Sequence, residues 1–221
     1  MARFCTLCSG SSGNSAYISG SDTAVLVDAG KSCKQLLAAM EAKKIDPKAL
    51  RGILVTHEHT DHVSGLKTLV KRLKIPVYGS QEVLEKLTYG KILEPQTEMV
   101  PVTPGQPLEI GSLRVEVFDT PHDSIHSVGY KFHTMDGRTL MIATDLGYVT
   151  EEIRQRMTGC DLVLLEANYD QRMLGASSYP YYLKQRIASN QGHLSNESCA
   201  AELVGLVRAG TTRLILGHLS Q

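Results

Sequence analysis

The stretch that most constrains the fold is Gly-Ile-Leu-Val-Thr-His-Glu-His-Thr-Asp-His at residues 52–62. Its apolar part, residues 53–55, is short and rich in β-branched side chains, which predicts a buried strand. Three histidines and an aspartate follow, and we expect a helix to begin at Ser64. These four polar side chains are therefore predicted to lie on a short connector between a strand and a helix: His57, His59, Asp61 and His62.

The residue types on this connector indicate a metal site. Imidazole and carboxylate groups are ligands of zinc, manganese and iron. Because a short loop turns alternate side chains apart, two adjacent ions explain the pattern better than one ion. His57 and His59 then bind one ion, while Asp61 and His62 bind the other. A solvated polar loop is the alternative, and it is disfavoured because this combination is rare by chance.

The string His-x-His-x-Asp-His after a strand resembles the metal-binding motif of the metallo-β-lactamase superfamily. The resemblance implies a four-layer αββα sandwich, in which each of two paired sheets is covered by helices on its outer face. It also implies a hydrolytic centre with one or two metal ions at one edge of the paired sheets.

The order of the predicted elements agrees with such a sandwich in one domain over residues 1–221. Up to about residue 95, apolar strands alternate with amphipathic helices, which indicates α/β layering. Residues 97–145 form strands separated by glycine turns, and we expect this run, including 100–102, to form a second sheet. Helices at 150–157, near 179–188 and at 195–208, and strands at 161–166 and 213–217, are expected to complete the chain.

Serines mark several expected helix beginnings, at Ser32, Ser64 and Ser80. The helix at 195–208 is expected to bury one apolar stripe, formed by Cys199, Leu203, Leu206 and Val207.

Composition bounds the function. The chain of 221 residues has 23 basic and 23 acidic side chains, so no overall field attracts nucleic acid, and a polyanion must be held by metals and a local basic patch. No apolar stretch is long enough to span a membrane, and the first residues do not begin a signal peptide, so a soluble cytoplasmic protein is expected. Five cysteines fit reduced thiols, with Cys5 and Cys8 as ordinary strand residues rather than a redox pair or half a zinc site. The oligomeric state is left open.

The resemblance supplies the remaining ligands. His122 follows a predicted strand and matches the family's third-motif histidine, with His126 as the alternative. Asp145 matches the aspartate shared by two metals in the family, although it also suits a cap for the helix at 150. His218 matches the last ligand. The resemblance thus implies two divalent ions (Zn, Mn or Fe), one bound by His57, His59 and His122, the other by Asp61, His62 and His218, with Asp145 shared.

Other residues are expected close to the ions. Asp28 ends a strand and is a candidate to accept hydrogen bonds from the metal-binding loop or from a ligand histidine. Asp61 is expected to orient the attacking hydroxide while it binds metal. His193 is either a turn residue before a helix or an imidazole that holds a phosphate or protonates the leaving oxygen.

Candidate substrate contacts come from three segments. The glycine-rich residues 9–14 form either a flexible hairpin turn or a phosphate-binding nest, which makes Ser12 and Asn14 candidates. Asn168 follows Glu166 at the end of a strand, where the polar residues suit helix capping or substrate contact. Residues 179–186 interleave tyrosines with Lys184 and Arg186, which is typical of a surface helix or of a single-strand nucleic-acid binder.

Four strings narrow the resemblance to the bacterial single-domain YycJ/WalJ-type nuclease group: residues 9–15, His122-Asp123 before Gly-Tyr, residues 165–170 and residues 192–196. The group implies 5′-to-3′ exonuclease action on DNA with a 5′ end. Relatives run on beyond the position of His218, so the C-terminal end is expected to be truncated relative to the family. The alternatives are a thioester or lactone hydrolase with the same centre, and a protein that binds nucleic-acid ends without cleaving them.

Overall fold

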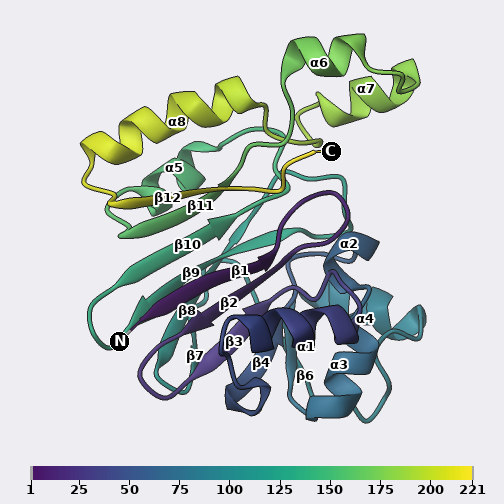
Figure 1. The fold of residues 1–221 in the computed structure, drawn as a ribbon, viewed down its shortest axis with the longest axis vertical. Coiled ribbons are helices and arrows are strands. Elements are labelled where there is room, and N and C mark those ends of the chain that lie inside the picture. Colours follow the sequence, from purple (N-terminus) through teal and green to yellow (C-terminus); the bar gives the residue numbers. More distant parts are fainter. Residues whose placement is uncertain (1, 221) are drawn as a thin grey trace.

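Two six-stranded sheets form the middle of the molecule, as seen in the computed structural model, which describes residues 2–220 (Figure 1). The first sheet contains, in spatial order, β1 (Arg3–Cys8), β2 (Ser15–Ser19), β3 (Ala24–Val27), β4 (Leu50–Leu54), β5 (Val77–Gly79) and β6 (Met99–Pro101). The second contains, in spatial order, β12 (Arg213–Gly217), β11 (Leu162–Glu166), β10 (Thr139–Ala143), β9 (Val128–Thr134), β8 (Leu113–Asp119) and β7 (Leu108–Ile110).

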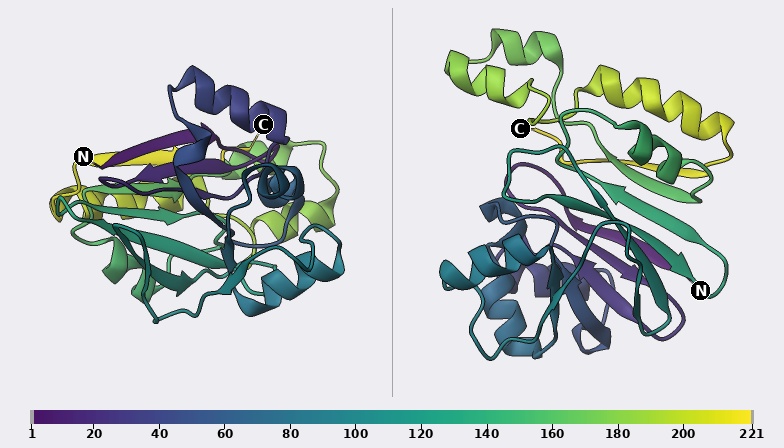
Figure 2. Two further views of the ribbon diagram at one scale, coloured as in Figure 1. Left: turned by 90° about the horizontal axis from the view of Figure 1, so that it is seen from below. Right: turned by 180° about the vertical axis from the view of Figure 1, so that it is seen from behind.

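Helices cover the outer face of each sheet (Figures 1 and 2). The first sheet carries α1 (Cys33–Ala42), α3 (Leu66–Leu73) and α4 (Gln81–Tyr89). The second carries α5 (Glu151–Met157) and α8 (Asn196–Arg208). Four further helices lie in the connections: η1 (Pro47–Ala49), α2 (Thr60–Val63), α6 (Gln171–Ala176) and α7 (Tyr181–Ile187). The predicted αββα sandwich is confirmed.

The alternation of side chains along the strands explains these layers. In β10, Leu140 and Ile142 face the apolar cluster between the sheets, while Met141 and Ala143 face the cluster beneath α5 and α8. Successive side chains of an extended strand point to opposite faces of the sheet. Because both sets are apolar in β10, each face requires an apolar partner layer. Each large side chain buried in this way stabilises the fold by about 1.5–3 kcal/mol.

The strand at 99–101 lies in the first sheet, so the prediction that this segment joins the second sheet was wrong. β6 pairs in parallel with β5, with Val77 opposite Met99. Helix α4 connects the two strands, and a strand–helix–strand unit places its second strand parallel to the first in the same sheet. The second sheet therefore begins at β7.

The expected helix beginning at Ser64 was also wrong. Helix α2 begins after His59 and already contains Asp61 and His62, whereas α3 begins after Gly65. Gly65 separates the two helices because its backbone lies against the carbonyl oxygen of Lys31, which is 1.9 Å from the position that a Cβ would take. No residue with a side chain fits there.

The other expected helix beginnings agree better with the structure. Ser32 forms a capping box with Gln35 at the start of α1. Ser80 precedes α4, but its hydroxyl donates to the carbonyl of His126 instead of capping the helix. Along α8, Cys199 and Leu206 are buried and Leu203 is partly buried, whereas Val207 is 59% exposed, contrary to expectation. The buried stripe is narrower than predicted because Val207 faces solvent.

Within residues 2–220 there is no helix long and apolar enough to cross a membrane. All five cysteines are free, and Cys5 and Cys8 lie in β1 as expected.

Candidate metal centre

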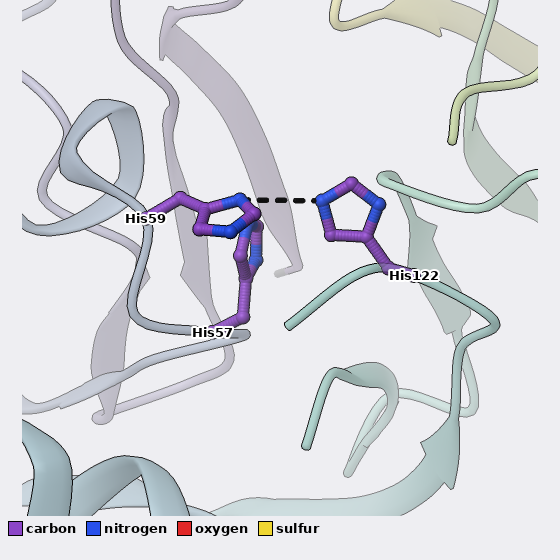
Figure 3. A group of neighbouring side chains, drawn as sticks. All are labelled: His57, His59 and His122. Atoms are coloured by element: carbon purple, nitrogen blue, oxygen red, sulfur yellow. Dashed lines mark hydrogen bonds between the residues drawn. The ribbon is translucent and has the colours of Figure 1, made fainter. Parts of the chain in front are cut away.

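Polar side chains converge at the edge of the sandwich where β3, β4, β10, β11 and β12 end. The first group comprises His57 and His59 from the loop after β4, and His122 from the loop after β8. Figure 3 shows the three imidazoles turned toward a common point, with Nε2 of His122 at 3.3 Å from Nδ1 of His59. Nε2 of His57 is buried and has no hydrogen-bond partner. Such an orphaned nitrogen fits a metal ligand.

Hydrogen bonds determine which nitrogen each histidine offers. Nδ1 of His122 donates to the carbonyl oxygen of Gly192 at 3.0 Å, so Nε2 keeps its lone pair toward the site. Burial lowers the pKa of His122, and it lowers the pKa of His57 well below the usual range. Both imidazoles are thus held in the neutral form that a metal ion requires.

A second group lies beside the first and comprises Asp61, His62 and His218. Nε2 of His218 lies 3.2 Å from Oδ2 of Asp61, and Nε2 of His62 lies 3.4 Å from the same oxygen. Asp145 lies between the groups: Oδ2 is 3.3 Å from Nε2 of His62, and Oδ1 is 3.8 Å from Nε2 of His122. Oδ2 of Asp145 is buried without a hydrogen-bond partner, so this carboxylate also fits a metal ligand.

The second group is rich in negative charge. Burial opposes protonation of His218, but Asp145, Asp61 and Glu166 outweigh it and raise the pKa of His218 to about 10. Burial likewise opposes protonation of His62, but Asp145 and Asp28 raise its pKa well above the usual range. The carboxylates therefore stabilise positive charge in this half of the site, whether it is a proton on a histidine or a bound divalent cation.

Asp28 holds the metal-binding loop in place. Its Oδ1 accepts from the backbone N–H of Thr56 at 2.8 Å, and its Oδ2 accepts from the hydroxyl of Thr56 at 2.9 Å and from Nδ1 of His62 at 2.8 Å. These bonds fix the ring of His62 with Nε2 toward Asp61 and Asp145.

Three of the six non-glycine residues with positive φ within residues 2–220 lie at the same edge. Asp28, Asp145 and His218, each just after a strand, have φ values of 63°, 57° and 51°. The left-handed region costs about 1–2 kcal/mol for a residue with a Cβ. Three such residues around one cluster show that packing imposes this geometry, which is typical of functional sites.

Glu166 contributes more than the sequence indicated, where capping or substrate contact was considered. It is fully buried, and Oε1 accepts from Nδ1 of His193 and from Nδ1 of His218, both at 2.8 Å. Oε2 accepts from the backbone N–H groups of Leu146 and Leu194. Glu166 thus orients two histidines, and its position at the end of an apolar strand was the signal for that role.

Glu58 was missed by the sequence analysis. It lies between His57 and His59, with a side chain that is only 6% exposed, and its Oε1 accepts from Lys86 Nζ at 2.7 Å and from the backbone N–H of Ile125 at 3.1 Å. It therefore ties the loop after β4 to the loop that carries His122. The adjacent histidines drew attention to metal binding, and nothing in the sequence pointed to this link.

The structure separates His122 from His126. His126 lies outside the cluster, where Nδ1 is 2.9 Å from Glu82 and Nε2 is 2.9 Å from Asp119. Asp145 does not cap the helix that follows, because Thr150 does.

A pocket of about 490 Å³ opens over the two groups and is called the metal pocket here. His193 lines it with a side chain that is 21% exposed, 3.8 Å from Oδ1 of Asp145. Arg186 and Asn168 also line it. Arg186 pairs with the carboxylate of Asp123, which neighbours His122, and Asn168 donates to the carbonyl oxygen of His218 at 2.8 Å.

Three expected substrate contacts do not line the metal pocket. Lys184 donates to the carbonyl oxygen of Gly175 in α6, and Ser12 accepts from Lys31. Asn14 is buried and donates to Asp61 and to the carbonyl oxygen of Gly10. The glycine-rich segment 9–14 is therefore an ordered turn braced against α2 by Asn14.

The chain is similar in sequence to known proteins over nearly its whole length. Residues 23–219 match the family described as "Beta-lactamase superfamily domain". Over 220 residues the chain is 34% identical to the exodeoxyribonuclease YycJ of Bacillus anthracis, covering 99% of this chain and 82% of that protein. Over 223 residues it is also 34% identical to the exodeoxyribonuclease WalJ of Streptococcus pneumoniae, with the same two coverages.

A solved structure extends the comparison at the level of the fold. The zinc-bound PqqB of Methylobacterium extorquens superposes with a TM-score of 0.80 at 17% identity, covering 100% of this chain and 89% of that one.

Proposed function

Because the chain belongs to the metallo-β-lactamase superfamily, a family of hydrolases, we propose that it cleaves phosphodiester bonds of nucleic acid as a 5′-to-3′ DNA exonuclease. One observation carries this proposal: two relatives named exodeoxyribonuclease match nearly the whole chain, including the segments that build the metal pocket. The substrate is DNA with a 5′ end, and the place of action is the cytoplasm.

Two divalent transition-metal ions (Zn, Mn or Fe) are proposed as cofactors. His57, His59 and His122 hold one ion, Asp61, His62 and His218 hold the other, and Asp145 serves both. When bound, such ions lower the pKa of water and stabilise negative charge on phosphoryl oxygens. Two buried atoms without a hydrogen-bond partner support this assignment. They are Nε2 of His57, in the first ligand set, and Oδ2 of the shared Asp145.

Residues of the metal pocket then position the substrate. Asp61 is partly exposed to the pocket and is placed to orient the attacking water. His193 also lines the pocket, held by Glu166, and is placed to donate a proton to the leaving 3′ oxygen or to bind the scissile phosphate. Asn168 and Arg186 provide polar groups for the substrate backbone, and Arg186 does so while paired with Asp123.

The test is cleavage of a 5′-phosphorylated oligonucleotide with a fluorescent label at its 3′ end, in the presence of Mn²⁺. The proposal predicts that labelled fragments shorten progressively from the 5′ end, and that the Asp145→Asn variant is inactive. Hydrolysis of a thioester with intact DNA would instead identify the rival enzyme. Tight binding of the oligonucleotide with no shortening would identify a binding protein. Either result overturns the proposal.

A further inference from the structure

A second pocket of about 630 Å³ lies beside the metal pocket and is called the side pocket here. Its walls come from the end of β11, from α6 and from the segment before α7. The two pockets share Asn168, Tyr179, Ile187 and Ser220 in their linings, so they adjoin one another. Tyr179 is thus a boundary residue of both pockets.

The chemistry of the two pockets differs. The wall of the side pocket combines apolar and aromatic side chains, among them Tyr169, Met173, Leu174 and Leu219, with neutral serine and asparagine residues. Among residues 2–220, no Lys or Arg lines it. Its one charged residue, Asp170, accepts hydrogen bonds from the backbone N–H groups of Arg172 and Met173 at the start of α6. The described lining therefore offers no cation to a phosphate, but it offers apolar and aromatic surface to a flat neutral ring.

Tyr179 lies where the pockets meet. Its side chain is 45% exposed, and it lines both pockets. A ring at such a junction can stack on a nucleobase while the phosphate beside that base stays in the metal pocket, next to Arg186 and the histidines.

We propose that the side pocket binds the nucleobase of the 5′-terminal nucleotide, the one that is released, with Tyr179 stacked on it. The inference rests on the proposed exonuclease function and adds a base-binding subsite to it. Because stacking uses the face of the ring that every base has, the subsite accepts all four bases with modest differences. That tolerance suits an enzyme that removes nucleotides one after another.

The test uses three 5′-phosphorylated oligonucleotides: an intact one, one with an abasic residue at the 5′ end, and one with an abasic residue at the third position. The wild-type protein should cleave the terminally abasic substrate with a kcat/KM about 10-fold or more below the intact one, which is the usual size of one base–aromatic stack. The abasic residue at the third position should have little effect on removal of the first nucleotide.

Variants locate the effect at the side pocket. Tyr179→Ala should lower kcat/KM for the intact substrate by the same factor. Its kcat/KM for the terminally abasic substrate should equal that of the wild type. Tyr179→Phe keeps the ring and should show the same preference for the intact substrate as the wild type. Tyr89→Ala is the matched control, because Tyr89 is 92% exposed and lines neither pocket.

Two results overturn the inference alone. One is equal cleavage of the intact and terminally abasic substrates by the wild type. The other is a loss in Tyr179→Ala that is the same for both substrates, which indicates a structural role. If the wild type cleaves none of the oligonucleotides, the proposed function fails, and the base-binding subsite fails with it.

Discussion

The two sheets build the metal centre in different ways. The first sheet contributes residues 57–62, in which four candidate ligands lie on one loop and the short helix α2. The second sheet contributes single residues from segments far apart in the sequence: His122, Asp145, Glu166 and His218. We call these the local wall and the assembled wall.

The two walls fix the positions of their side chains in different ways. In the local wall, Asp28 and Thr56 fix the loop through short hydrogen bonds. In the assembled wall, precision depends on the parallel register of β10, β11 and β12, which pairs Ala143 with Leu165 and Leu165 with Leu216. Replacement of a ligand that serves one ion should therefore act on that ion, whereas replacement of Asp145, which faces both groups, should act on both.

The largest expected effect compares His57→Ala with Asp145→Asn. Both variants should abolish hydrolysis, because both remove a candidate ligand. His57→Ala should lose up to one ion per chain, while Asp145→Asn should weaken binding of both ions, since its two oxygens face both groups. Elemental analysis of the purified variants measures this, with circular dichroism to verify the fold. Equal losses in the two variants would contradict the sharing of Asp145 by both ions.

His193→Ala should have the next largest effect. A positioned proton donor typically contributes ~10²–10⁴ in rate, so activity on DNA should fall on that scale while metal content stays normal. The activity of the variant on an aryl phosphodiester, whose leaving group needs no proton, should fall far less. Equal losses on both substrates would mean that His193 binds the phosphate. A loss of metal in this variant would make His193 a ligand and contradict its proposed role.

Glu58→Gln and Glu166→Gln form a matched pair, with one buried carboxylate on each wall. Residues that orient metal ligands typically contribute 10–100-fold to metal affinity or activity, and we expect losses of about that size. Glu166→Gln should lose more, because Glu166 bonds to two histidines directly, whereas Glu58 acts through the backbone of Ile125. Titration with Zn²⁺ under competition by a chelator measures both affinities. The reverse order would show that the local wall is the more sensitive one.

The smallest effect concerns His126, which lies on the same loop as His122 but outside the assembled wall. Partial burial opposes its protonation, yet hydrogen bonds with Glu82 and Asp119 outweigh it and raise the pKa of His126. Its contribution to stability is therefore present below the pKa of the unfolded chain and is lost as the pH rises through the folded pKa. The stability difference between the wild type and His126→Gln should shrink with rising pH in denaturant unfolding. It should be small because solvent screens this pair, and catalysis should be unchanged.

The same contrast explains how far the sequence predicts the structure. The local wall could be predicted because its ligands are adjacent in the chain. The αββα layers were implied by the family resemblance of that motif, and the order of the predicted strands and helices agreed with them. The break at Gly65 could not, because it depends on the carbonyl of Lys31, which only the folded chain brings near. The contacts of Glu166 and Lys184 could not be predicted for a related reason. The first gains its role from two histidines distant in sequence, and the second turns toward Gly175 rather than toward the metal pocket.

The most direct test of a centre built from these two walls is anomalous diffraction from crystals grown with Mn²⁺. Two anomalous peaks are expected. One should lie among His57, His59 and His122, the other among Asp61, His62 and His218, with Asp145 between them. A single peak, or a second peak away from the assembled wall, would contradict the account.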